Sequence, residues 1–591
     1  MSSVQTKEEL KKLIQTARGQ IKADLVIKNC KVIDVFGGTV RRADIAISGD
    51  QIAGIGSYSG IQEFDAKGAY AAPGFIDSHI HIESSYLSPE ELGRLLVPHG
   101  GTTIIADPHE IVNVCGIKGL DYMMKAAKNT KLDIKFMLPS CVPATPFETN
   151  GGAFEAADMA EPITRDNILG LAEFMNCPGI INCDDSVLDK IMLAKQTGKL
   201  IDGHAPGLTG KDLQAYVSAR IVADHECATV EEMQEKIALG MYVMVREGSA
   251  CHNLTTIAKG ITASNSRRCV LCSDDRQPKT MLELGHLDNS LRMLVRQGID
   301  PIEAVRMATI NAAECFRLTD RGALAPGYLA NIVLFDNLTD FNVSSVFMHG
   351  TLTARDGKYL PTMVKEDITP VKSSVHLKDF SAEKFKMHLK SDLVHTIRIL
   401  PGGVVTQKSI DRIHVESGEF VFDPEADICK VAVVERHQMT GNVACGFLKG
   451  YGIKRGAIAV SIAHDSHNII VVGVSDDEMA CAVEALKEQE GGMVLVCGGK
   501  VVGSMPMPIA GLMSDQSGEW VRDRLTQLHE TAWNQLGVAK DVEPIMTLTF
   551  MSLSVIPEVK LTDRGLFDYF KFSFIPVEAN PGEMDQANGH D

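Results

Sequence analysis

Six residues whose side chains commonly bind metal ions follow five separate apolar runs of the sequence. His79 and His81 are one residue apart at the end of the run that begins at Gly74. Positions i and i+2 of a strand point to the same side, so these two imidazoles could bind one ion. The other candidates each follow a later run, at Glu173, His204, His225 and Asp274. Imidazole and carboxylate groups together are typical ligands of zinc, iron and manganese.

Eight apolar runs, mostly separated by segments of helical length, predict the strands that carry these residues. The runs are Gly74–His79, Thr102–Ala106, Asp133–Pro139, Ile168–Glu173, Leu200–His204, Arg220–His225, Met241–Arg246 and Cys269–Ser273. Between them, patterns such as Pro89–Val97 and Val230–Leu239 predict helices. Eight β-then-α units predict a (β/α)8 TIM-like barrel, in which catalytic groups lie at the carboxyl ends of the strands. We therefore expect the six candidate ligands to converge on one face of a barrel.

Six ligands exceed the number that one tetrahedral ion needs, which favours a binuclear centre. We assign His79, His81 and Asp274 to one ion and His204 and His225 to the other. Glu173, at the end of the fourth strand, would bridge the two ions. Two cations lower the pKa of a water between them, so that hydroxide is available at neutral pH. Asp274 would also accept the hydroxide proton and pass it to the leaving group. Taken singly, each residue also fits a core histidine or a helix-capping carboxylate.

The sequence before and after the barrel predicts further domains. Short strand-like runs separated by glycine turns occur on both sides of it, so we expect the barrel to be inserted in a small β-sandwich. The C-terminal region alternates strands with helices and is typical of an α/β or α+β domain. We predict an α/β protein, with a C-terminal α/β domain, divided as follows: β-sandwich 1–72, catalytic barrel 73–321, second part of the β-sandwich 322–361, linker 362–378 and C-terminal domain 379–591.

Charge and composition exclude several classes of function. The net charge of −18 disfavours nucleic acids and anionic membranes as partners. The sequence has no apolar run of 18 residues, and Met1–Gln20 lacks the apolar segment of a signal peptide. The 14 cysteines are scattered, which favours free thiols over a disulfide framework. We expect a cytoplasmic protein with a small-molecule substrate, no nucleic-acid or membrane partner, and a homo-oligomeric state, dimer or larger.

Several motifs resemble one enzyme superfamily. The segment Pro73–His81, the later histidines and Ser273-Asp274 resemble the amidohydrolases. More narrowly, the sequence resembles the bacterial adenine deaminase family over nearly its full length, in the motifs at 79–85, 107–110, 172–176, 202–206, 224–226, 272–275, 461–468 and 505–511. This resemblance implies hydrolysis of adenine, a purine base, to hypoxanthine and ammonia in purine salvage or catabolism. It also implies two Mn²⁺ or Fe²⁺ ions, with Zn²⁺ also possible.

Deamination of a purine needs further groups beside the metal ions. One proton must reach N1 of the ring and another the departing amine. Glu83 could bind or protonate the base, or it could be a loop carboxylate at a helix N-terminus. Asp275 could face the substrate or cap the following helix. Ser84 and His109 are further candidate substrate-binding residues, and His109 with Glu110 could instead contact an extra ion.

His464 and His467 lie three positions apart in the C-terminal region. They could be metal ligands, or their segment could form a lid over the barrel mouth. Of these interpretations we favour a loop with ordinary polar contacts.

Three functions remain in competition. A purine-base deaminase is the leading hypothesis. Cyclic amide hydrolases, hydantoinase- or imidazolonepropionase-like, use the same barrel, but a glutamate rather than a lysine on the fourth strand argues against the members with a carbamylated lysine. A non-catalytic binding barrel would not need the complete ligand set. The adenosine deaminase mechanism is disfavoured, because no acid follows His204 in His204-Ala205-Pro206-Gly207. The cytidine deaminase fold is excluded, because the sequence contains no Pro-Cys pair.

Overall fold

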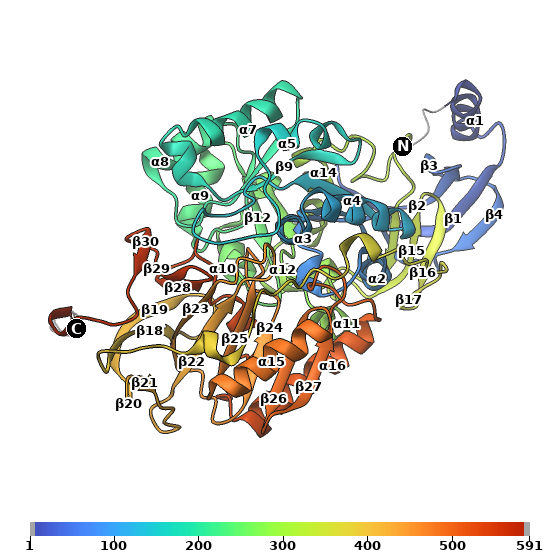
Figure 1. Ribbon diagram of the computed structural model, residues 1–591. Coiled ribbons are helices and arrows are strands. Elements are labelled where there is room, and N and C mark those ends of the chain that lie inside the picture. Colours follow the sequence, from blue (N-terminus) through green and yellow to red (C-terminus); the bar gives the residue numbers. More distant parts are fainter. Residues whose placement is uncertain (1–5, 584–591) are drawn as a thin grey trace.

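The computed structural model describes residues 6–583. In Figure 1 the N-terminal strands lie at the right, the barrel elements in the upper and central part, and the orange and red C-terminal domain below them. Among the described residues, no helix combines the length and the apolar character that a membrane crossing requires.

All eight predicted barrel runs form strands, and the neighbouring strands pair in parallel within two sheets. The strands are β6 (Phe75–Ile80), β7 (Gly101–Ala106), β8 (Asp133–Leu138), β9 (Ile168–Phe174), β10 (Leu200–Gly203), β11 (Ala223–Asp224), β12 (Tyr242–Arg246) and β13 (Cys269–Cys272). A parallel bridge between Ile80 and Asp274 joins β13 to β6. On the other side, the Val222 amide donates to the Ile201 carbonyl at 2.9 Å. These contacts close the ring of strands, as the predicted barrel requires.

Apolar side chains fill the inside of the ring. Each strand contributes at least one member to a single cluster of buried residues, which includes Ile76, Ile105, Met137, Ala172, Leu200, Ala223, Met244 and Val270. Helix α14 (Ile310–Cys315) adds Ala312 and Ala313 to this cluster. The barrel interior is therefore a packed apolar core, and the polar candidate residues lie at the ends of the strands.

Helices follow the strands along the outside of the barrel. Capping residues fix where several of them begin: Asp184 accepts the Ser186 amide, and Thr229 accepts the Glu232 amide. The helices are α2 (Pro89–Leu96), α3 (His109–Cys115), α4 (Ile117–Ala126), α5 (Ala156–Met159), α6 (Cys177–Ile181), α7 (Asp185–Gln196), α8 (Gly210–Ser218), α9 (Val230–Ala238), α10 (Leu254–Ile257), α11 (Pro278–Leu284), α12 (Leu287–Arg296) and α13 (Pro301–Met307).

A nine-stranded sheet contains strands from both sides of the barrel sequence. It holds β1 (Ala23–Asp34), β2 (Thr39–Ser48), β3 (Gln51–Gly56), β4 (Gly60–Asp65), β5 (Tyr70–Pro73), β14 (Ile332–Phe335), β15 (Val343–Met348), β16 (Thr351–Arg355) and β17 (Lys358–Tyr359). The chain leaves the sheet at β5 and returns at β14, which pairs antiparallel with β5. Helix α1 (Lys7–Ala17), capped by Thr6, precedes the sheet.

The first strand is longer than its sequence pattern suggests. Two runs, Ala23–Ile27 and Lys31–Val35, look like separate strands, yet the chain from Ala23 to Asp34 forms the single strand β1. The register with β2 shifts between Ile27 and Cys30. Asn29 has φ 59°, a conformation that asparagine adopts more readily than most residues. A bulge at this point therefore keeps the strand continuous.

The C-terminal domain is built on an eight-stranded sheet. Every neighbouring pair in it is antiparallel except β18 with β23, which makes the domain α+β. The strands are β18 (Leu393–Ile399), β19 (Thr406–Arg412), β22 (Ile428–Val434), β23 (Val443–Lys449), β24 (Ala457–Val460), β25 (Ile469–Gly473), β26 (Gly492–Cys497) and β27 (Lys500–Pro506). The remaining elements are β20 (Val415–Glu416), β21 (Glu419–Phe420), β28 (Val559–Thr562), β29 (Gly565–Asp568), β30 (Ser573–Ile575), α15 (Asp476–Glu488), α16 (Gly518–Thr531) and α17 (Met546–Thr549).

One barrel segment, residues 145–150 between β8 and α5, is tied to the C-terminal domain. We call it the docking segment. The Thr149 amide donates to Oδ1 of Asp563 at 2.8 Å, and the Thr149 carbonyl accepts from the Asn468 side chain at 2.7 Å. Backbone carbonyls at 146, 147 and 150 accept three further side-chain hydrogen bonds from the C-terminal domain, from Arg564, Thr562 and Gln438. The two domains are therefore joined by directional contacts beside the barrel mouth.

Candidate metal centre

The barrel closes at the point where the first predicted ligands lie. Asp274, two residues beyond β13, donates its amide to the His79 carbonyl and accepts the His81 amide, both at 2.9 Å. The two histidine Nε2 atoms are 3.1 Å apart. Oδ1 of Asp274 is 3.5 Å from Nε2 of His79 and 3.1 Å from Nε2 of His81. Backbone pairing thus brings these three side chains to one point.

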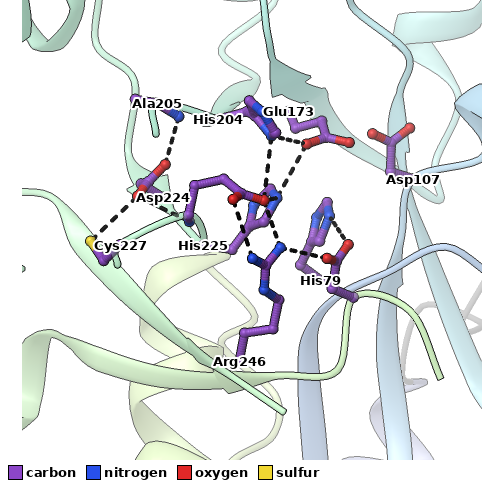
Figure 2. A network of polar contacts seen from close by, with 12 residues as sticks. His79, Asp107, Glu173, His204, Ala205, Asp224, His225, Cys227 and Arg246 are labelled. Atoms are coloured by element: carbon purple, nitrogen blue, oxygen red, sulfur yellow. Dashed lines mark hydrogen bonds and ion pairs between the residues drawn. The ribbon is translucent and has the colours of Figure 1, made fainter. Parts of the chain in front are cut away.

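Glu173, near the end of β9, lies between two groups of histidines. Its Oε1 atom is 3.3 Å from Nε2 of His81. Its Oε2 atom is 2.8 Å from Nδ1 of His204 and 3.2 Å from Nε2 of His225 (Figure 2). Burial raises the pKa of this carboxyl, but the histidines, His204 first, hold it well below its usual range. An ionised glutamate with one oxygen toward each group has the geometry of a bridging ligand.

A buried arginine beside the cluster was not anticipated from the sequence. Arg246, the last residue of β12, places Nη1 2.6 Å from Oδ2 of Asp274 and 2.5 Å from Oε1 of Glu226. Burial raises the pKa of Asp274, and Arg246 leads the groups that bring it well below its usual range. Two features of the sequence could have indicated this contact: Arg246 ends a predicted strand, and Glu226 directly follows His225.

Groups behind the histidines orient their rings. Nδ1 of His81 is 3.1 Å from the Asp107 carbonyl. Nδ1 of His79 faces the buried Asp202 carboxylate at 3.8 Å, which is beyond hydrogen-bond length. The opposite nitrogen of each ring, Nε2, consequently points to the centre of the cluster. Metal-binding histidines are commonly oriented by such outer partners.

The donor atoms fit a metal ion. In the cluster, His79, His81 and Asp274 offer atoms that all lie within 4.8 Å of one another, and so do His79, Glu173 and His225. Two imidazole Nε2 atoms 3.1 Å apart cannot both carry a proton toward each other, whereas both can donate lone pairs to a cation. The carboxylates supply the negative charge that a buried cation needs. The cluster can therefore hold a metal ion.

A cavity of about 570 Å³ opens onto the cluster, and both the barrel and the C-terminal domain line it. The barrel side includes Glu173, His204, His225, Arg246 and Asp274, and the C-terminal side includes Ile462, His464, Asp465, Phe550 and Tyr569. A small molecule in this cavity would contact both domains at once.

Three of the four further candidate residues line this cavity. Ser84 donates its hydroxyl to Oε1 of Glu110 at 2.8 Å. Nδ1 of His109 lies 3.2 Å from Asp107 and 3.5 Å from Glu173. Burial lowers the pKa of His109, but Asp107 leads the carboxylates that raise it to about 10.

Asp275, the third of these residues, is half-buried and accepts the Ala250 amide at 2.6 Å. Burial and the nearby Asp274 charge raise its pKa to about 7. A carboxyl group of this kind can hold or release a proton near neutral pH.

Glu83 lies behind the cavity wall and is not among the described residues that line it. It accepts the Ile111 amide at 3.1 Å in the first turn of α3. Burial and the charge of Glu110 raise its pKa to about 8. This position agrees with the alternative of a carboxylate at a helix N-terminus.

The segment with His464 and His467 is a loop that forms part of the cavity wall. His464 and its neighbour Asp465 line the cavity, and His467 is fully buried behind them. Neither ring nitrogen of His467 has a hydrogen-bond partner within residues 6–583. The sequence could not place this segment, because its neighbours lie more than 300 positions away in the barrel.

The barrel region and the C-terminal region each match a known protein family. Residues 70–353 match the amidohydrolase family, and residues 403–573 match the adenine deaminase C-terminal domain. A beta-aspartyl dipeptidase from Fervidobacterium islandicum AW-1 matches 58% of this chain and 99% of its own, with 15% identity and a TM-score of 0.45.

Relatives of high identity extend over nearly the whole chain. Adenine deaminase 2 of Desulfotalea psychrophila is 63% identical over 97% of this chain and 100% of its own length. Adenine deaminase of Ligilactobacillus salivarius is 50% identical over 97% of this chain and 99% of its own. The chain therefore belongs to the adenine deaminase family.

Proposed function

We propose that this protein hydrolyses adenine to hypoxanthine and ammonia, in purine salvage or catabolism. The observation that carries the proposal is the composition of the cavity wall. The segment that matches the adenine deaminase C-terminal domain contributes His464, Asp465 and Phe550 to the same cavity that contains the barrel histidines. An enzyme with only the barrel would lack this wall. In the reaction, a bond forms between C6 and the water oxygen, the bond from C6 to the amino nitrogen breaks, and ammonia leaves.

We further propose that the centre takes two divalent ions, Mn²⁺ or Fe²⁺, with Zn²⁺ also compatible with these ligands. His79, His81 and Asp274 would hold one ion, His204 and His225 the other, and Glu173 both. Such ions supply a water of lowered pKa as nucleophile. The two oxygens of Glu173, each facing a different histidine group, support the bridging assignment.

Different side chains around the centre carry out the separate proton transfers of the reaction. Asp274 accepts the proton of the attacking water, and Arg246 holds its other oxygen in place. Asp275, with a pKa raised by burial to about 7, is the candidate to carry a proton to N1 or to the amine. Ser84 and His109 bind the substrate. Glu83 positions α3 through the Ile111 amide rather than touching the base.

An ammonia-release assay tests this function. Metal-free protein would be loaded with Mn²⁺ or Fe²⁺ and offered adenine, adenosine and a panel of cyclic amides. We expect kcat/KM for adenine to exceed that for every other compound. Faster hydrolysis of a cyclic amide, with no ammonia from adenine in metal-loaded protein, would assign the site to a different amidohydrolase activity.

We also propose that the protein works in the cytoplasm. All 14 cysteines are free thiols, many of them buried in the core. Reducing compartments preserve such thiols, whereas oxidising ones favour disulfides. Fractionation of the native cells followed by immunodetection measures this directly.

A further inference from the structure

A second group of metal-binding side chains lies where the barrel meets the C-terminal domain. Glu110 is in the first turn of α3, and His464 and His467 lie between β24 and β25. Nδ1 of His464 is 3.9 Å from Oε1 of Glu110. Nε2 of His467 is 4.0 Å from Oε2 of the same carboxylate. Each residue offers one donor atom, and these atoms lie within 4.8 Å of one another.

His467 is the member that most needs a partner. Its side chain is fully buried, and both ring nitrogens are without a hydrogen bond in the described part of the chain. Leaving a buried polar group unpaired destabilises the folded state, so such groups normally have a partner. Its backbone is fixed, because Arg436 donates from Nε to the His467 carbonyl at 2.5 Å. The ring is therefore held toward Glu110 without a protein partner.

The other two side chains are also held in place. Ser84 donates to Oε1 of Glu110 at 2.8 Å and fixes the carboxylate. The His464 ring stacks on Phe550, with centroids 4.8 Å apart and planes at 23°. Support of this kind is typical around metal ligands, whose orientation depends on outer contacts.

The distances favour an ion over direct pairing. Separations of 3.9 and 4.0 Å are too long for hydrogen bonds between histidine and glutamate. Two metal–ligand bonds of roughly 2.0–2.2 Å each can span such a gap when they meet at one ion. Two imidazoles and one carboxylate form a ligand set that suits first-row transition metals.

We propose that Glu110, His464 and His467 bind a further divalent transition-metal ion, separate from the cluster around Glu173. Two of its ligands come from the C-terminal domain and one from the barrel, so the ion fastens the domains together at the cavity. Glu110 and His464 also line that cavity, so the ion lies within reach of small molecules that enter it.

Metal content tests this site. Purified full-length protein would be stripped with a chelator, loaded with Mn²⁺, dialysed and analysed by mass spectrometry. We expect His467→Gln and Glu110→Gln each to hold one Mn²⁺ per chain fewer than the unmodified protein. His437→Gln is the matched control, because His437 contacts the same loop through the Ser466 carbonyl at 2.7 Å but offers no ligand. This control should keep the full metal content.

Two further measurements keep the result unambiguous. Circular dichroism identifies variants that fail to fold, and the two substitutions lie in different domains, so one folded variant is enough. Anomalous diffraction at the manganese edge should give a peak between the three side chains. Unchanged metal content in a folded variant, or no anomalous peak there while the Glu173 cluster is occupied, would overturn the proposal. Both readouts are independent of which substrate the enzyme takes.

Discussion

The two carboxylate oxygens of Asp274 contact different groups. Oδ1 faces His79 and His81, and Oδ2 is paired with Arg246 at 2.6 Å. Its backbone adopts φ 61°, an uncommon conformation outside glycine, although aspartate is among the residues that tolerate it best. The strand end therefore aims this carboxylate at the cluster by an unusual backbone turn, which is common at functional sites.

Replacing Asp274 with asparagine tests its role as the proton acceptor. Asparagine keeps the size and one oxygen but cannot take a proton at neutral pH. Proton transfer by a positioned side chain contributes roughly 10²–10⁴-fold to rate, so kcat for adenine should fall by about that factor. Metal content must be measured on the same sample. An Asn variant that retains its ions and near-normal turnover would transfer the role to Asp275.

At the residue scale, the sequence predicted the candidate metal ligands but not the residues that contact those ligands. His79, His81 and Glu173 follow apolar runs, so strand periodicity places them at one barrel face. Arg246 and Glu226 also occupy strand ends, but only the tertiary structure brings the arginine to the aspartate. Glu83 directly precedes Ser84 in the same motif, yet among the described residues only Ser84 of the two lines the cavity.

At the scale of elements, one buried aspartate links the first and last barrel strands. Asp77, in β6, accepts the Ser273 hydroxyl at 2.6 Å and lies 2.8 Å from Nε2 of His286. Its other oxygen accepts the Ser273 amide at 3.1 Å. These contacts join β6, the end of β13 and the start of α12, close in sequence to the candidate ligands His79 and Asp274. The barrel closure therefore depends on a polar hub as well as on backbone pairing.

Asp77→Ala should weaken this closure strongly. It leaves the Ser273 and His286 groups buried without their hydrogen-bond partner, and an unsatisfied buried polar group costs roughly 1–3 kcal/mol. The expected result is a lower melting temperature in a thermal scan, together with weaker retention of metal. Asp212→Ala, an exposed change on α8, is the control and should leave both unchanged. Equal melting temperatures for Asp77→Ala and the unmodified protein would contradict the hub.

The sequence predicts the position of a strand well where one short apolar run defines that strand. β6, β7 and β12 begin and end within about a residue of the predicted runs. β11 was not predictable in length: only Ala223–Asp224 forms strand, because Arg220 still belongs to the turn after α8, with φ 74°. The antiparallel order of the C-terminal sheet also depends on long-range pairing that local sequence does not encode.

At the scale of the whole molecule, the C-terminal domain completes the cavity. The docking segment holds it beside the barrel mouth through hydrogen bonds to Asp563, Asn468 and Gln438. Glu148, in the same segment, is buried. Burial and the charges of Asp465 and Asp563 raise its pKa to about 8, while Ser466 and Thr145 act in the opposite direction. The interface consequently contains a carboxyl group that stays protonated at neutral pH.

This group predicts a pH dependence of stability. In the unfolded chain Glu148 ionises near its ordinary value of 4.5, whereas in the folded protein it stays protonated up to about pH 8. The folded state binds more protons between these values, so the free energy of unfolding falls as pH rises from 4.5 to 8.

Glu148→Gln removes that dependence. We expect its melting temperature to exceed that of the unmodified protein by an amount that grows from pH 5 to pH 8. Glu231→Gln, at an exposed position on α9, should follow the unmodified protein. Parallel curves for Glu148→Gln and the unmodified protein would show that Glu148 ionises normally in the folded state.

The pairing of β5 with β14 has a consequence for how such a chain could arise. Pro73 and Ile332 are register partners, and opposite residues of antiparallel strands have Cα atoms about 4.5–5.5 Å apart. The barrel segment therefore leaves the sheet and returns to it at neighbouring positions of two paired strands. A single recombination event between two neighbouring residues would suffice to introduce it. For the same reason, the two ends of the barrel segment are close enough for a short linker to join them.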